Sequence, residues 1–190
     1  MNYEEKIDLL ASLIKRSAHT IALTGAGVST ESGIPDFRSP GGMWAKLDPF
    51  KVATVTALKR DPAAFYNIHL DFLARCSGAQ PNAAHYALAQ LEQDRLLYGV
   101  VTQNIDGLHR KAGSKTVWEV HGHLRTCHCM GCKTNYPFDF LVDQYNSGTN
   151  PPRCQKCGGV LRLDVVLFED PMGEDFFWAT QAMTSCQLLV

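Results

Sequence analysis

The chain has 190 residues, enough for one good-sized hydrophobic core or for one domain with a small insert. Its 18 basic and 19 acidic residues give a net charge of −1, which argues against a strongly basic nucleic-acid-binding protein. A hydrophobic content of 45% with 19% charged residues is typical of globular proteins and excludes a disordered chain.

Neither end of the chain resembles an export signal or a membrane anchor. Residues Met1 to Lys6 are acidic and lack the apolar segment of a signal peptide. The longest uncharged stretch, Phe176 to Val190, is too short and too polar to span a bilayer. We therefore expect a cytoplasmic protein without membrane contact.

In chain order, predicted helices alternate with predicted strands. Residues 3–17 carry apolar residues at helical spacing, and residues 20–24 form a short apolar strand that runs into a glycine turn. Residues 33–50 are rich in Gly and Pro and predict a long loop. Further helices are expected to begin at Asp61-Pro62 and after Asn82, and another helix is expected over 174–184. Further strands are expected at 97–102, 116–120, 165–168 and 185–190. The alternation predicts an α/β fold, with a parallel sheet covered by helices on both faces.

The last predicted strand ends the chain. Parallel sheets bind ligands in loops beyond the carboxyl ends of their strands, yet no loop follows residues 185–190. We therefore expect the sequence to be a piece of a longer protein, truncated at its C-terminus.

The first predicted strand leads into Gly25-Ala26-Gly27-Val28-Ser29-Thr30. This segment half fits a dinucleotide-binding fingerprint, but Thr30 stands where the third Gly or Ala belongs. Glycines let the backbone approach a phosphate closely, and a tight turn with no ligand explains them equally well. Downstream, Arg38 can pair with a phosphate or with Asp36, and Phe37 can cover a planar ring.

Polar side chains follow the next two strands. Gln103, Asn104 and Asp106 suit ribose hydroxyls and an amide group, although helix capping is the simpler explanation for Asn104 or Asp106 taken alone. His121 follows the third strand and precedes Gly122, and an imidazole at that place can act as a general base near neutral pH.

Four of the seven cysteines form two CxxC pairs, at Cys129/Cys132 and Cys154/Cys157. The 21 residues from Lys133 to Arg153 separate the pairs, close to the spacing of four-cysteine zinc sites. Four thiolates leave no open coordination position, so we expect one structural zinc ion. Cys127 is a weaker competitor for a place among the ligands.

The chain contains, in order, the Gly25-Ala26-Gly27-Val28-Ser29 segment with Glu31 to Arg38, Thr102-Gln103-Asn104-Ile105-Asp106, Val120-His121-Gly122 and the two CxxC pairs. Together these motifs resemble the sirtuin family. The resemblance implies a Rossmann-like NAD-binding domain (1–122 and 164–190) with an inserted zinc-ribbon module (123–163). It also implies an NAD-dependent protein lysine deacetylase, whose products are the free lysine, nicotinamide and O-acyl-ADP-ribose. In this family the acyl oxygen attacks the ribose carbon that bears nicotinamide, and a histidine base then activates a ribose hydroxyl.

Carried onto this sequence, the resemblance implies a catalytic group of His121, Asn104 and Asp106. Residues Val165, Val166, Leu167 and Phe168 would add a strand to the substrate peptide, and the four paired cysteines would bind zinc. The NAD-binding set would be Gly25, Ala26, Gly27, Ser29, Thr30, Glu31, Pro35, Asp36, Phe37, Arg38, Trp44, Gln103, Asn104, Ile105, Asp106 and His121.

The sequence also departs from the family pattern. Leu163, Glu169 and Asp170 replace a Pro and a Gly-Glu pair around the strand that is expected to bind the peptide. In the branch that prefers acidic acyl groups, Tyr is followed three residues later by Arg; here Tyr66 is followed by His69, which predicts an uncharged acyl group such as acetyl.

Two other functions remain open at this stage. One is a protein ADP-ribosyltransferase that uses the same NAD site. The other is a non-catalytic binding module built on a zinc ribbon, for which the near-neutral charge argues against nucleic acid as the partner.

Overall fold

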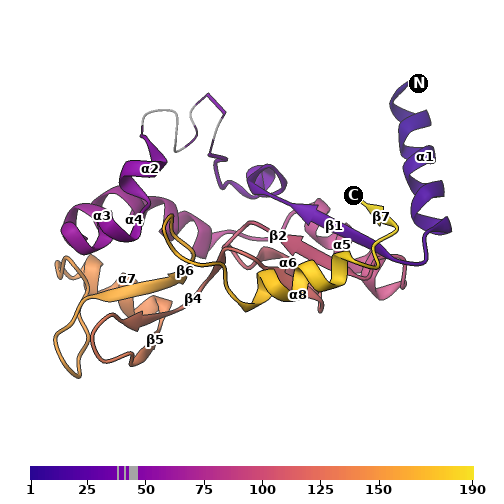
Figure 1. The fold of residues 1–190 in the computed structure, drawn as a ribbon. Coiled ribbons are helices and arrows are strands. Elements are labelled where there is room, and N and C mark those ends of the chain that lie inside the picture. Colours follow the sequence, from indigo (N-terminus) through magenta and orange to yellow (C-terminus); the bar gives the residue numbers. More distant parts are fainter. Residues whose placement is uncertain (38, 41, 43–46) are drawn as a thin grey trace.

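The computed structural model describes residues 1–37, 39–40, 42 and 47–190 (Figure 1). Its main sheet is parallel throughout and has the strand order β3-β2-β1-β7. β2 and β3 therefore lie on one side of β1 and the last strand, β7, lies on the other, and ligands of such folds bind beyond the carboxyl ends of the strands. The four strands are β1 (Thr20–Thr24), β2 (Gly99–Thr102), β3 (Val117–Glu119) and β7 (Leu188–Leu189).

Helices cover both faces of this sheet, as predicted. Neighbouring residues of a strand point to opposite faces, and in β1 Ile21 packs with Ala179 of α8 (Glu174–Met183). Ala22 instead lies in a cluster with Val100, against which Leu88 of α5 (Ala83–Gln93) packs. These two small cores hold the parallel sheet between its helices.

A second lobe lies beside the parallel sheet, on the left in Figure 1. Its antiparallel sheet has the order β5-β4-β6. The largest hydrophobic core joins this sheet to α4, with Tyr66, Leu141 and Leu161 fully buried. The elements are α2 (Pro49–Val52), α3 (Val55–Arg60), α4 (Pro62–Gly78), β4 (Gly122–Cys129), β5 (Asn135–Pro137), α7 (Phe138–Asn146) and β6 (Leu161–Val165).

Local signals place several helices where they were expected. Asn82 accepts a hydrogen bond from the Ala84 amide and begins α5, and Asp61 with Pro62 begins α4. α1 (Tyr3–Arg16) also forms, capped by Asn2, but within this helix Ile14 is the buried residue. Ile7 and Leu10 of its apolar face remain 48% and 45% exposed.

Two predicted strands differ from the structure. The strand expected at 165–168 is β6, which ends at Val165 and pairs antiparallel with β4 rather than joining the parallel sheet. Beyond β6 the Val166 amide still donates to the carbonyl of His121, and Phe168 then bridges to Thr54 instead. The strand expected at 185–190 is β7, which spans Leu188–Leu189 and is flanked by main-chain hydrogen bonds of Gln187 to His19 and of Val190 to Ile21 and Leu23. Within the described part of the chain, no helix has both the length and the apolar character needed to cross a membrane.

Candidate active site and metal centre

A cavity of about 470 Å³ opens where β1, β2 and β3 end. Two further segments complete its wall, the continuation of β6 and one face of α4. Twelve residues from the predicted NAD, catalytic and substrate sets line it: Ala26, Ser29, Phe37, Gln103, Asn104, Ile105, Asp106, His121, Val165, Val166, Leu167 and Phe168. Segments far apart in the sequence therefore meet beyond the carboxyl ends of three neighbouring parallel strands.

Ser29 connects the loops after β1 and β2. It lies in the 3₁₀ helix η1 (Ala26–Ser32), and its Oγ donates to Oδ2 of Asp106 at 2.8 Å. Asn104 donates from Nδ2 to the same Oγ at 3.1 Å and to the carbonyl of Gly25 at 3.2 Å. With Ser29 and Asn104 only 1% and 7% exposed, this arrangement fixes the amide and the carboxylate before any ligand arrives.

Asp106 combines a contact at the start of a helix, whose N-cap is Gly107, with its place at the site. Its Oδ1 accepts the Leu108 amide at 2.9 Å, at the start of α6 (Leu108–Ala112), while Oδ2 holds Ser29. The choice between a capping residue and a site residue therefore does not arise, because the two carboxylate oxygens serve different partners.

Two buried histidines lie behind Ser29. His85 faces the Ser29 hydroxyl at 3.5 Å, and burial lowers its pKa. His109 contacts Thr24 Oγ1 through Nε2 at 2.9 Å, and its pKa falls to about 4, chiefly because the ring is desolvated. Their ring centres are 4.8 Å apart. Since both rings are uncharged at neutral pH, they support the hydroxyl groups of the site without adding charge to it.

His121 presents one ring nitrogen for proton transfer. Its Nδ1 lies 3.0 Å from the carbonyl oxygen of Gln103, which can only accept, so Nδ1 carries the proton and Nε2 is left as a base. The next residue, Gly122, has φ of 80°, and a side chain there would collide with the carbonyl oxygen of Asp164. The glycine is therefore required where the chain passes from β3 into β4.

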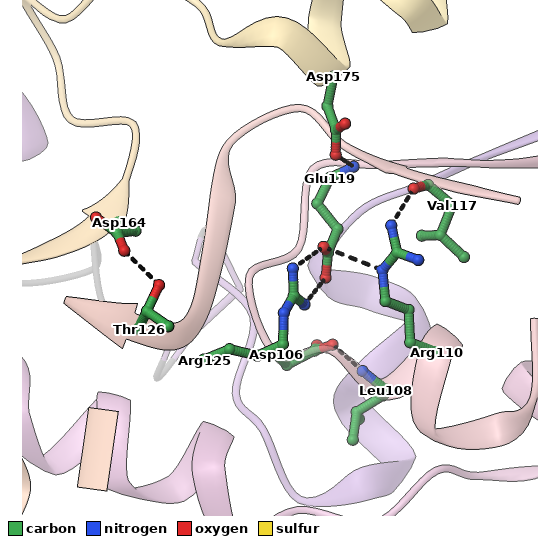
Figure 2. A network of polar contacts seen from close by, with 9 residues as sticks. All are labelled: Asp106, Leu108, Arg110, Val117, Glu119, Arg125, Thr126, Asp164 and Asp175. Atoms are coloured by element: carbon green, nitrogen blue, oxygen red, sulfur yellow. Dashed lines mark hydrogen bonds and ion pairs between the residues drawn. The ribbon is translucent and has the colours of Figure 1, made fainter. Parts of the chain in front are cut away.

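Glu119 ends β3 two residues before this histidine, and Figure 2 shows the network of polar contacts around it. Its carboxylate is almost fully buried and accepts Nη1 and Nη2 of Arg125 at 2.8 and 2.6 Å and Nε of Arg110 at 3.2 Å. These partners lower the pKa of Glu119 against the opposing effect of burial. Its own amide donates to Asp175 of α8 at 2.8 Å. One carboxylate thereby ties β3 to α6 and to β4, on either side of the turn that bears His121.

The sequence pointed to Tyr66 and His69 for the acyl group, but not to the wall that α4 forms around His69. Phe65, His69, Phe72 and Cys76 recur at spacings of three and four and face the cavity. That spacing is visible in the sequence and could have identified the wall. His69 is 7% exposed and burial lowers its pKa, so it adds a neutral ring to an apolar surface. The remaining lining residues outside the predicted sets are Ile34, Ala53, Leu73, Leu163, Glu169, Asp170 and Met172.

Several predicted residues do not line the cavity. Tyr66 points away from it and donates its hydroxyl to the carbonyl of Leu161 at 2.7 Å, so it is placed to support the second lobe. Arg38 and Trp44 lie outside the described residues. The others that do not line it are Gly25, Gly27, Thr30, Glu31, Pro35 and Asp36.

The four paired cysteines converge in the second lobe. All four sulfur atoms lie within 4.8 Å of one another, with 3.4 Å between Cys129 and Cys157 and 3.6 Å between Cys132 and Cys154. A tetrahedral ion with Zn–S bonds of about 2.3 Å requires sulfur atoms about 3.8 Å apart, so the donor set fits zinc. The Sγ of Cys127 instead faces the carbonyl of Pro137 at 3.7 Å.

Comparison with known proteins shows the family of the chain. The Sir2 family model matches residues 25–190, so the chain belongs to the Sir2 family. An NAD-dependent protein deacetylase 2 of Caldanaerobacter subterraneus subsp. tengcongensis is 48% identical over 95% of this chain and 72% of its own length. An NAD-dependent protein deacetylase of Caldivirga maquilingensis is 50% identical over 86% of this chain and 63% of its own length.

Solved structures show the same likeness. A Sir2 structure with a deacetylated peptide and 3′-O-acetyl ADP ribose superposes with a TM-score of 0.91 at 34% identity, covering 100% of this chain and 75% of its own. A Sir2 structure with a peptide and NAD⁺ gives a TM-score of 0.86 at 33% identity, covering 100% of this chain and 74% of its own. The chain thus spans about two thirds to three quarters of the length of these relatives.

Proposed function

We propose that this chain carries the catalytic cavity of an NAD-dependent protein lysine deacetylase, acting on acyl-lysine proteins or peptides in the cytoplasm. The observation that carries the proposal is the meeting, in one cavity of a Sir2-family chain, of the Ser29-Asn104-Asp106 arrangement and a histidine with a free Nε2. We assign residues 1–122 and 164–190 to the NAD-binding domain and 123–163 to the zinc module.

Bound NAD supplies a ribose carbon with nicotinamide as leaving group, and ribose hydroxyls that can be activated. Asn104 and Asp106 would orient the ribose and the amide, because Ser29 already holds both side chains in place. His121 would accept a proton at Nε2, since Gln103 keeps the proton on Nδ1. The arrangement needs no rearrangement of buried charge before reaction.

The acyl group would meet the wall formed by α4. Phe65, Phe72 and Leu73 are apolar, and the neutral His69 offers no cation to an acidic acyl chain. A carboxylate in this wall would be desolvated without a charged partner, which costs several kcal/mol. Uncharged acyl groups such as acetyl are therefore the proposed substrates.

The peptide would lie along residues 165–168, but with fewer main-chain hydrogen bonds than full strand addition would give. The amides of Val166, Leu167 and Phe168 already donate to His121 O, Asp170 Oδ2 and Ala53 O. The carbonyls of Leu167 and Phe168 also accept the amides of Asp170 and Val55, so the segment would offer a peptide chiefly its side chains and the Val166 carbonyl, to which a peptide N–H could donate.

Mass spectrometry of an acetyl-lysine peptide incubated with this chain, with and without NAD, tests the proposal. We expect NAD-dependent loss of one acetyl group with release of nicotinamide, and no loss with His121→Ala protein that keeps its zinc and its fold. Transfer of ADP-ribose to protein would favour the transferase alternative instead. An unmodified peptide with both this chain and a longer version of it would refute the proposal.

A further inference from the structure

The segment that follows β6 is fastened to α3 at the edge of the cavity. Phe168 bridges Thr54 in parallel register, its amide donates to Ala53 O at 3.0 Å, and its carbonyl accepts the Val55 amide at 3.1 Å. Ala53 and Phe168 both line the cavity, so this seam is part of its wall. Whatever holds the seam closed also sets the shape of the cavity.

Glu169, at the end of the seam, has an unusual backbone conformation. Its φ is 76°, in the left-handed region that non-glycine residues rarely occupy. The Asp170 amide donates to Leu167 O at 3.1 Å, which makes residues 167–170 a tight turn with Glu169 at its third position, where glycine is preferred. Such strain persists where surrounding contacts enforce it, and it is concentrated at functional sites.

The contact that enforces this conformation is on α3. Oε2 of Glu169 accepts the Thr56 amide at 2.9 Å and the Thr56 hydroxyl at 2.8 Å. On the other side of the turn, Asp170 accepts the Leu167 amide at 2.9 Å and pairs with Arg162 of β6. The two carboxylates therefore hold the turn between α3 and β6, and both residues line the cavity.

We propose that Glu169 is a positioning residue for the acyl-lysine peptide: its bond to Thr56 latches residues 166–170 onto α3 and so fixes the cavity wall that contacts the peptide. The inference rests on the proposed function, because it assigns the peptide to this wall. A glycine at position 169 would make the turn without strain, but only a side chain with an acceptor reaches Thr56.

Kinetics of the deacetylation reaction separate a latch from a general structural role. Glu169→Ala keeps the strained backbone and removes the acceptor, and Thr56→Val removes the hydroxyl donor alone. We expect each to raise KM for the peptide, by about fivefold for Glu169→Ala, the size of one net hydrogen bond at an exposed position. We also expect KM for NAD and kcat to stay within about twofold of the wild-type values. Glu169→Gln keeps an acceptor, so its KM for the peptide should lie close to the wild-type value. Thr180→Val, an exposed threonine change on α8, is the matched control and is expected to change nothing.

Hydrogen exchange tests the latch without relying on activity. The amides of Val166 to Asp170 are expected to exchange faster in Glu169→Ala protein, with the four-stranded sheet unchanged. Glu169→Gly is expected to show the same faster exchange with higher thermal stability than Glu169→Ala, because it relieves the strained φ. Unchanged exchange in these amides, or unchanged peptide KM in an active enzyme, would overturn the inference. Faster exchange in a chain with no deacetylase activity would overturn only its assignment to the peptide, along with the proposed function.

Discussion

Replacing Glu119 by Gln removes the charge at the centre of the network in Figure 2 while keeping the shape of the side chain. The carboxylate is 3% exposed, and three N–H groups of Arg110 and Arg125 converge on it. Breaking a buried ion pair by removing one partner costs about 3–5 kcal/mol. Here the side chains of Arg110 and Arg125 are 41% and 47% exposed and can be solvated by water in the variant. We therefore expect the free energy of unfolding to fall by about 2 kcal/mol.

Urea unfolding followed by the fluorescence of Trp118 and Trp178 measures this loss. A fall of about 2 kcal/mol corresponds to a midpoint lower by about 1 M urea, with an unchanged slope. Glu174→Gln, an isosteric change at an exposed carboxylate on α8, is the matched control, with an expected loss below about 0.5 kcal/mol.

The pH dependence of the difference provides a second test. The arginines lower the pKa of Glu119 in the folded state, so the stabilisation is complete above the ordinary value of 4.5 and is lost as the pH falls through the lower folded value. The difference between wild-type and Glu119→Gln stability should therefore narrow below about pH 4.5. A difference under about 0.5 kcal/mol at pH 7, or one that does not narrow in acid, would refute the role given to this carboxylate.

The remaining predictions concern the metal centre, the acyl wall and the buried histidines. Cys129→Ser is expected to lose zinc and to unfold at lower temperature, whereas Cys127→Ser should keep one zinc ion per chain by metal analysis; equal zinc loss in both would give Cys127 a ligand role. His69→Arg is expected to raise the rate on succinyl-lysine relative to acetyl-lysine peptides, and a wild-type preference for succinyl would contradict the neutral wall. Because burial lowers the pKa of His109 from 6.5 to about 4, the free energy of unfolding should fall by up to about 3 kcal/mol between pH 6.5 and 4. If this ring causes the fall, the free energy of unfolding of His109→Gln protein should depend less on pH over that range.

Much of the fold was readable from local signals. A cap such as Asn82 or a proline in a first turn acts within one helical turn, so the starts of α4 and α5 follow from a few adjacent residues. Short apolar runs bounded by turn residues likewise located β1, β2 and β3. Their ends were less certain, and the run at 165–168 was assigned to the wrong sheet because hydrophobicity alone does not name a pairing partner.

The candidate site was likewise predictable from the sequence only in part. The types of residue that follow the strands at Asn104, Asp106 and His121 were visible in the sequence, and so was the spacing of the four cysteines. A parallel sheet brings the carboxyl ends of its strands to one edge, so residues that follow different strands were expected to lie close together. Their side-chain types then predicted the chemistry of the site. The family resemblance gave the same residues their expected roles.

Only the tertiary structure decided which side chains complete the cavity. Tyr66 and His69 stand three residues apart on one helix, yet one is buried in the second lobe and the other faces the cavity. Glu169 meets Thr56 across 113 positions of the chain. The sequence shows that Glu169 replaces the glycine of the family pattern, but not the contact that holds its strained φ. By itself, the sequence determined the residue chemistry and the local elements, because these depend on neighbours along the chain. The partners of Glu119, His69 and Glu169 depend on how separate elements pack, and that was determined only when the whole chain folded.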